Sequence, residues 1–176
     1  MITGIVYANN TAYYEGNKIF NLTFKKKKNQ VGTFSFKAYA LDSTDLNNIK
    51  ERNIVQILLN GKVMFEGYIR KVKYDRYNMM WDVEGESLEG ILNTINTSNP
   101  VTLRMGYNGD LMTTKELVRE VMFRLAGIRP TGPNGWSITG DDGVPLFFYR
   151  VEQRTVLDHI AALARLSNYT FRCYLK

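Results

Sequence analysis

The alternation of apolar and polar positions predicts strands in the first half of the chain. Residues 33–39 alternate with a period of two, which is typical of a half-buried strand. Apolar runs at residues 2–7 and 19–24 predict two more strands. We expect residues 19–24 and 33–39 to form a long hairpin with a basic tip, here called the lysine tip. Its four members are Lys25, Lys26, Lys27 and Lys28.

The pair Asn60 and Gly61 is the clearest turn signal in the chain. It separates an apolar run at residues 54–59 from a strand pattern at residues 63–74. Both central residues of a type I′ turn need a positive φ, which Asn and Gly tolerate best. The sequence therefore predicts a tight hairpin at this point.

The strand after this turn contains Gly67, which predicts a bulge or a close backbone approach. A turn at residues 75–78 leads into a strand at 79–84, so we expect a meander of three antiparallel strands. The pattern at residues 45–52 predicts a short helix or a helical turn of poor amphipathicity.

After Pro100 the pattern takes the period of a helix. Thr113 and Glu116 have the spacing of a capping box, and apolar residues then share one face as far as Gly127, which ends the helix. Residues 127–144 are rich in Gly and Pro and predict a long surface loop.

A second amphipathic helix is predicted after a strand at residues 145–149. Thr155 supplies a cap-like start and Asn168 a stop. Alternation and aromatic content predict a final strand at residues 169–175.

These elements predict an α+β fold that is mainly antiparallel β. We expect a β-barrel or sandwich domain at residues 1–97. A smaller α+β portion with two amphipathic helices would occupy residues 98–176. The change of period near Pro100 supports the division.

Composition narrows the class of protein. The chain has 176 residues, 44% of them hydrophobic and 23% charged, as in a folded globular protein. A single Cys excludes an internal disulfide and a cysteine-based zinc site. No apolar run approaches the ~18 residues of a membrane span, so we expect a soluble product of the cytoplasm.

The residues that commonly carry catalysis are scarce. His159 lies at the border of a helical apolar face, which indicates a partly buried or surface histidine without catalytic duty. Cys173, in a predicted strand, is expected to act as a small hydrophobe. We find no triad and no phosphate-binding glycine motif, and predict neither an enzyme nor a cofactor.

Two carboxylate clusters have the residue types of a metal site or of a glycosidase acid–base pair. They comprise Asp82, Glu84, Glu86 and Glu89, and Asp141 with Asp142. Neither has the spacing of a calcium loop, and alternate carboxylates on a strand usually form a solvated face. We therefore predict no metal site.

The net charge of +6 is partly concentrated in the lysine tip. This tip is either a contact for an acidic partner, phosphate or lipid headgroup, or a solvated end that protects the sheet edge. Trp136 lies among Gly, Asn and Ser with no local core to join. The lysine tip and Trp136 are our candidate interface residues.

Residues 57–69 and 81–92 resemble the N-terminal part of bacteriophage tail hub proteins, also called baseplate hub or tail tip proteins. The shared features are an "apolar strand, turn, x-F-x-G-x-I" hairpin and a strand that leads into a helix start. The predicted helices that begin near residues 113 and 155 are similar to this group in their order and motifs.

The resemblance implies a non-enzymatic structural subunit of a virion tail or of a prophage-derived tail particle, made in the host cytoplasm. It implies ring assembly, often trimeric, between the tail tube and the spike or fibre apparatus. Partners would be tube subunits, spike or fibre proteins and other tail or baseplate proteins. Hub proteins are usually longer, so the chain is either a fragment or a compact member.

An alternative from another class remains open. A small β-barrel could bind single-stranded nucleic acid, with the lysine tip on the phosphates and Tyr or Phe rings stacked on bases. A tail endopeptidase or glycosidase is a third possibility, but no set of nucleophile, base and orienting group supports it.

Overall fold

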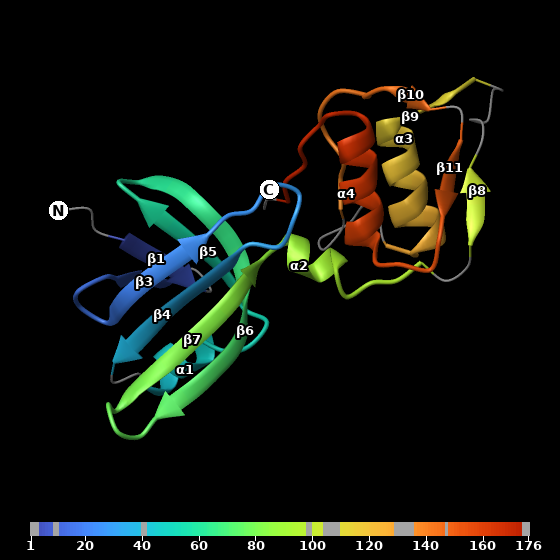
Figure 1. Ribbon diagram of the computed structural model, residues 1–176. Helices are drawn as coiled ribbons and strands as arrows, with labels where there is room; N and C mark the ends of the chain where they lie inside the picture. The colour runs from blue at the N-terminus through green and yellow to red at the C-terminus, as the bar shows by residue number, and fades with distance from the viewer. Residues whose placement is uncertain are drawn as a thin grey trace. The chain divides into compact units, whose positions relative to one another are not determined.

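The computed structural model describes residues 4–8, 11–39, 42–97, 100–103, 110–128, 136–146 and 148–173. The chain forms two compact units, shown in Figure 1. Unit 1 comprises Met1–Lys27, Val31–Gly90 and Cys173–Lys176, and unit 2 comprises Lys28–Gln30 and Ile91–Arg172. Whether residues 1–97 and 98–176 are separate domains stays a prediction.

Unit 1 is built on one antiparallel sheet of seven strands in the order β2-β1-β5-β6-β7-β4-β3. The sheet curls into a half-barrel (Figure 1), which confirms the predicted mainly antiparallel β class. The strands are β1 (Gly4–Ala8), β2 (Thr11–Tyr14), β3 (Ile19–Lys25), β4 (Thr33–Tyr39), β5 (Ile54–Leu59), β6 (Lys62–Asp75) and β7 (Met80–Ser87). The short helix α1 (Ser43–Asn48) connects β4 to β5.

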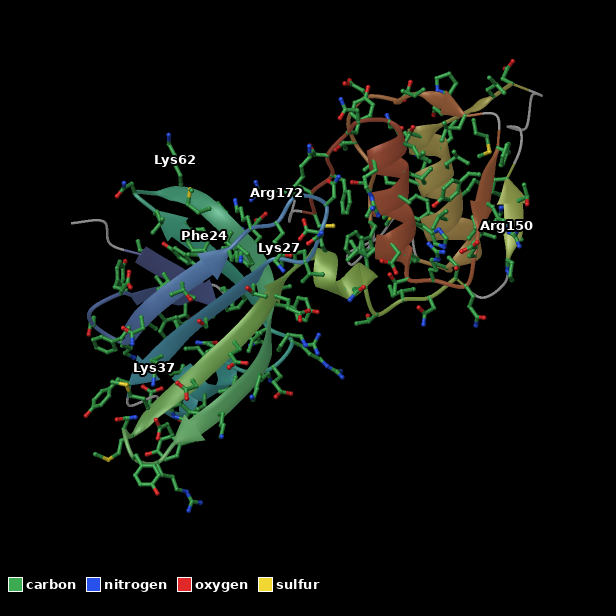
Figure 2. The ribbon with its side chains drawn as sticks, viewed as in Figure 1. Phe24, Lys27, Lys37, Lys62, Arg150 and Arg172 are labelled. Carbon is green, nitrogen blue, oxygen red and sulfur yellow. The ribbon has the colours of Figure 1, made fainter. Side chains whose placement is uncertain are left out.

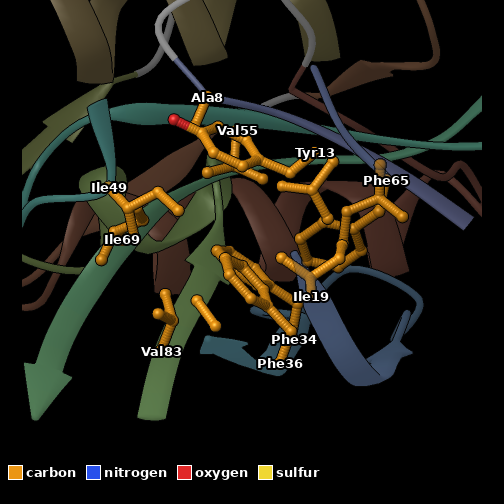
Figure 3. Close-up of a cluster of buried hydrophobic side chains, with 13 residues drawn as sticks. Ala8, Tyr13, Ile19, Phe34, Phe36, Ile49, Val55, Phe65, Ile69 and Val83 are labelled. Atoms are coloured by element: carbon orange, nitrogen blue, oxygen red, sulfur yellow. The ribbon is translucent and has the colours of Figure 1, made fainter. Parts of the chain in front are cut away.

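The core of unit 1 lies on the inner face of this curled sheet (Figure 3). Successive residues of a strand point to opposite faces, so the alternation in β4 buries Phe34 and Phe36. The Phe34 and Phe65 rings pack edge to face with centroids 5.6 Å apart. Val6, Ile57, Ile69 and Val83 complete the inner layer.

The predicted hairpins are present. β3 pairs with β4, and the lysine tip begins where β3 ends. Asn60 and Gly61 have φ of 50° and 74°, as a type I′ turn between β5 and β6 requires. At Gly67 the prediction of a close approach is confirmed, because an ideal Cβ there would lie 2.1 Å from the Glu86 carbonyl oxygen.

Unit 2 carries most of the helical residues and two small ribbons. Its elements, after α2 (Glu89–Leu92), are β8 (Val101–Leu103), β9 (Met112–Thr113), α3 (Thr114–Arg119), the π-helix η1 (Glu120–Leu125), β10 (Pro145–Leu146), β11 (Tyr149–Val151) and α4 (Val156–Leu166). β9 pairs with β10, and β8 pairs with β11. None of the described helices is long and apolar enough to cross a membrane.

Both predicted helix starts are confirmed. Thr113 and Glu116 form a capping box at α3. The Thr155 hydroxyl accepts a hydrogen bond from the Asp158 N–H at the start of α4. Gly127 has a φ of 67° after the first helical stretch, and Asn168 a φ of 56° after the second, so both stops are also confirmed.

Three expectations about elements need correction. The first predicted helix is not uniformly α, because η1 continues α3 in π geometry. The predicted strand at residues 145–149 is split between β10 and β11. The predicted strand at residues 169–175 is wrong over residues 169–173, which are irregular; residues 174 and 175 lie outside the described residues.

Side chains tether this C-terminal segment. The Asn29 side chain donates to the Tyr169 carbonyl at 3.2 Å and accepts from the Phe171 N–H at 3.1 Å. The Cys173 N–H donates to the Glu89 carboxylate at 2.9 Å. Polar side chains therefore satisfy backbone groups that a neighbouring strand would otherwise satisfy.

Candidate interaction surfaces

All four lysines of the lysine tip are exposed. The tip extends from the end of β3 into the turn that leads to β4. The next residue, Asn29, is held in place by its side-chain hydrogen bonds to the backbone of Tyr169 and Phe171. The structure thus brings four cations together on one hairpin, as predicted. Whether they contact a partner stays a proposal.

The aromatic rings closest to the lysine tip along the hairpin are part of the core. Phe24 packs on Phe65 with ring centroids 5.9 Å apart, and Phe65 also contacts Phe34. Nucleic-acid stacking needs exposed ring faces. Because these rings pack on one another, they do not favour the nucleic-acid hypothesis.

A hollow of about 410 Å³ in unit 1 is lined by charged, hydroxyl and aromatic side chains, with Lys25 of the lysine tip among them. Its charged groups largely satisfy one another, since Arg70 lies 3.1 Å from the Glu86 carboxylate. The Thr23 and Ser35 hydroxyls are 2.8 Å apart.

Trp136 is half-buried and lies in unit 2. It is the first described residue of an irregular segment that runs to β10. The lysine tip is divided, because Lys25, Lys26 and Lys27 belong to unit 1 and Lys28 to unit 2.

The surroundings of His159 indicate a structural role, and the residue is more buried than the sequence suggested. Only 3% of the residue is exposed. Nδ1 lies 3.0 Å from the Tyr149 hydroxyl, and Nε2 lies 2.9 Å from the Glu152 carbonyl oxygen. Because that carbonyl can only accept, Nε2 carries the proton and Nδ1 accepts from Tyr149. Burial raises the pKa of the Tyr149 hydroxyl, which favours its role as donor.

The environment of Cys173 disfavours nucleophilic chemistry. Burial, together with the neighbouring Glu89 carboxylate, raises the pKa of the Cys173 thiol to about 12. Since the thiolate is the reactive form, this thiol is inert near neutral pH.

The carboxylates of β7 form ion pairs across the sheet. Asp82 lies 3.4 Å from the Lys37 ammonium, and Glu86 pairs with Arg70. Among the described residues, no group of three or more His, Cys, Asp or Glu could hold a metal ion. In the irregular segment before β10, Asp142 pairs with Lys115 at 3.1 Å.

The structure also reveals an exposed aromatic surface that we did not single out in the sequence. We call it the aromatic tip; it lies where the β6–β7 hairpin turns and β4 ends. Its members are Tyr74, Tyr77, Met79 and the half-buried Trp81, whose ring packs on Tyr74 with centroids 5.0 Å apart. The sequence feature that could have pointed to this surface is the density of Tyr, Met and Trp around the predicted turn.

No protein-family model matches the sequence, and no curated protein matches it. Three solved structures are similar to the chain in fold. The 43 kDa tail protein of prophage MuSo2 from Shewanella oneidensis superposes with a TM-score of 0.57 and 15% identity, over 95% of this chain and 50% of that protein. A tail protein from Neisseria meningitidis MC58 superposes with a TM-score of 0.57 and 12% identity, over 93% of this chain and 45% of that protein.

The third structure is the prophage tail protein gp18 from Listeria monocytogenes EGD-e, with a TM-score of 0.56 and 12% identity, over 92% of this chain and 45% of that protein. The chain thus spans about half the length of each of these proteins. At such low identity the likeness establishes a shared fold that extends over nearly all of this chain.

Proposed function

We propose that this chain is a structural, non-enzymatic component of a phage-type tail. One observation carries the proposal: three tail proteins share its fold over 92–95% of its length. The bonded environments of His159 and Cys173 agree with a structural role. Within the tail, the hub motifs in the sequence favour a place at the tip or baseplate, between the tube and the spike or fibre apparatus.

The contacts of such a component would be protein surfaces. Buried apolar and aromatic area supplies most of the affinity at protein interfaces, and charges set the register and the rate of association. In this proposal the lysine tip meets an acidic surface of a neighbouring tail protein, and Trp136 supplies an apolar contact.

Localisation in tail particles tests the proposal. Tails would be purified from a producing strain, analysed by mass spectrometry and labelled with antibodies against the chain. We expect a stoichiometric component with label at one end of the tail. Particles that lack the chain, or normal tails from a strain in which its gene is deleted, would contradict the proposal.

A further inference from the structure

The β6–β7 hairpin ends in a turn that lies past the ends of the neighbouring strands (Figure 1). β5 pairs with β6 no further than Tyr68, so residues 70–75 pair with β7 alone among the described strands. On the other side of β7, β4 ends at Tyr39, opposite Met80. The turn itself, residues 76–79, is therefore an outermost point of unit 1.

This end of the hairpin exposes large apolar side chains. Tyr77 and Met79, in the turn, are 99% and 62% exposed. Tyr74 is 43% exposed and stands opposite Trp81, on the face of the sheet that holds the core. A cluster of such side chains is unlike singly scattered exposed residues.

The opposite face of the same end is also partly apolar. Tyr39 pairs with Met80 on that face, and Tyr39 is 46% exposed. Apolar groups thus surround the end of the hairpin, and a flat protein surface could contact only one of its faces. The aromatic tip also exposes only roughly 400 Å², taking about 200 Å² for a large side chain. A stable protein interface needs about 800 Å² from each partner.

The turn is held in a defined shape. The Asp75 carboxylate accepts hydrogen bonds from the Tyr77 N–H at 3.0 Å and from the Asn78 side chain at 2.6 Å. The Tyr74 and Trp81 rings pack across the two strands. A preordered tip loses less conformational entropy when it binds.

The cations beside the aromatic tip have no carboxylate partner. Lys73 and Arg76 are exposed, and neither forms a salt bridge within the described part of the chain. Asp82 stands opposite Lys73 in the register, but its carboxylate lies 3.4 Å from the Lys37 ammonium. The Asp75 carboxylate is hydrogen-bonded within the turn. Two cations therefore remain to attract an anionic surface.

The lysine tip lies at the other end of the sheet. Lys27, near the lysine tip's end of the β3–β4 hairpin, and Lys37, near the opposite end, are far apart in Figure 2. The ring beside the lysine tip, Phe24, packs on Phe65 in the core. The lysine tip can therefore attract anions but has no exposed ring next to it on β3, whereas the aromatic tip combines rings with cations.

We infer that the aromatic tip inserts into the headgroup region of a lipid bilayer that contains anionic lipids. Tyr and Trp are enriched at this layer, where the ring is buried and its polar atom stays in water. Lys and Arg side chains beside them extend to the lipid phosphates. A fluid lipid layer closes around a narrow hairpin from all sides, which a rigid surface cannot do. The inference goes beyond the proposed function, since it applies to the isolated chain whether or not it enters a tail.

Flotation of the full chain with lipid vesicles tests the inference. The vesicles consist of phosphatidylcholine, either pure or with about 30% phosphatidylglycerol. We expect binding to the anionic vesicles and weaker binding to the pure ones. Lys73→Gln with Arg76→Gln should weaken binding to anionic vesicles about tenfold and leave binding to pure phosphatidylcholine unchanged.

The apolar part of the contact is tested separately. Tyr77→Ser with Met79→Ser should weaken binding to both kinds of vesicle about tenfold or more. Tyr14→Ser is the control, at a tyrosine that is 51% exposed on β2 and lies level with Leu58, away from the aromatic tip. It should bind like the wild type. Because the replaced side chains are exposed, all these variants should unfold at the wild-type temperature.

Insertion is measured with fluorescence. Lipids with brominated acyl chains should quench the added emission of Tyr77→Trp but not that of Tyr14→Trp.

A wild-type chain that does not float with anionic vesicles overturns the inference. So does binding that survives Tyr77→Ser with Met79→Ser, or binding that is lost only when Lys25, Lys26, Lys27 and Lys28 are replaced by Ala. If vesicles are ignored and the Tyr77 variant fails to enter tail particles, the tip contacts a protein and the inference is wrong.

Discussion

Single residues fix this fold where space or polarity leaves no alternative. Gly67 shows this most directly, because β6 passes so close to Glu86 of β7 that a side-chain carbon would overlap its carbonyl group. His159 shows it through polarity, since its two ring nitrogens, although buried, are hydrogen-bonded to the Tyr149 hydroxyl and the Glu152 carbonyl. The chemistry of each residue is visible in the sequence, but its neighbours are not.

Gly67→Ala should destabilise unit 1 by about 2–3 kcal/mol, because the added methyl group meets rigid backbone. Chemical denaturation followed by circular dichroism measures the loss. Gly61→Asn is the control: Gly61 lies in the β5–β6 turn of the same sheet, its Cβ position is open, and Asn tolerates its positive φ. Equal stability of the two variants would show that the close approach is absent.

Tyr13 should make stability fall at alkaline pH. Its hydroxyl donates to Asp45 at 3.1 Å, and burial raises the pKa of Tyr13 to about 12 from its ordinary value of 10.0. The neutral hydroxyl is favoured in the folded state, so its contribution is complete below pH 10 and is lost as pH rises from 10 through 12.

The expected loss over that interval is about 2–3 kcal/mol, measured as the free energy of unfolding in urea between pH 8 and pH 12. Other tyrosines also titrate there, so the comparison is with Tyr13→Phe. That variant should be less stable at pH 8 but should lose less stability as pH rises. Parallel pH profiles for the two proteins would contradict the assignment.

At the scale of elements, prediction succeeded where the signal is local. A type I′ turn needs only Asn60 and Gly61, and a capping box needs only residues 113–116, so both are readable from the chain. Elements that depend on a distant partner were missed or wrong. β2 and β8 are short, and the segment at residues 169–173 alternates like a strand but bonds to side chains.

The π-helix and the aromatic tip escaped prediction for related reasons. Apolar spacing does not reveal the bond from the Ala126 N–H back to the Val121 carbonyl, which is characteristic of η1. The exposure of Tyr74 and Tyr77 depends on where β4 and the core end, which is a tertiary property. By contrast, the lysine tip was predictable because it follows from one hairpin.

The cap of α4 gives a prediction at this scale. Thr155→Ala should cost about 1 kcal/mol, because the Asp158 N–H loses its acceptor at 3.1 Å. Thr155→Ser keeps the hydroxyl and should stay close to wild type. Thermal unfolding of the two variants, compared side by side, checks this. If the Ser and Ala variants are equally destabilised, the loss of stability arises from packing of the threonine methyl group and not from the cap.

At the scale of the whole molecule, the core of unit 1 lies entirely between Val6 and Val83. We therefore expect a fragment of residues 1–97 to fold by itself, since a chain of roughly 100 residues can bury an adequate core. Cooperative thermal unfolding and well-dispersed amide signals are the expected measurements. A fragment with random-coil signals would show that the predicted domain boundary is wrong.

The β5–β6 turn has a practical consequence for imaging. Asn60 and Gly61 are exposed, and no atom lies within 4 Å of the Cβ position at Gly61. Lengthening a loop costs little once its ends are held by paired strands. A short epitope or fluorophore attachment sequence inserted at this turn would therefore label the protein away from both the lysine tip and the aromatic tip. Electron microscopy could then locate unit 1 in an assembled particle without disturbing the surfaces under study.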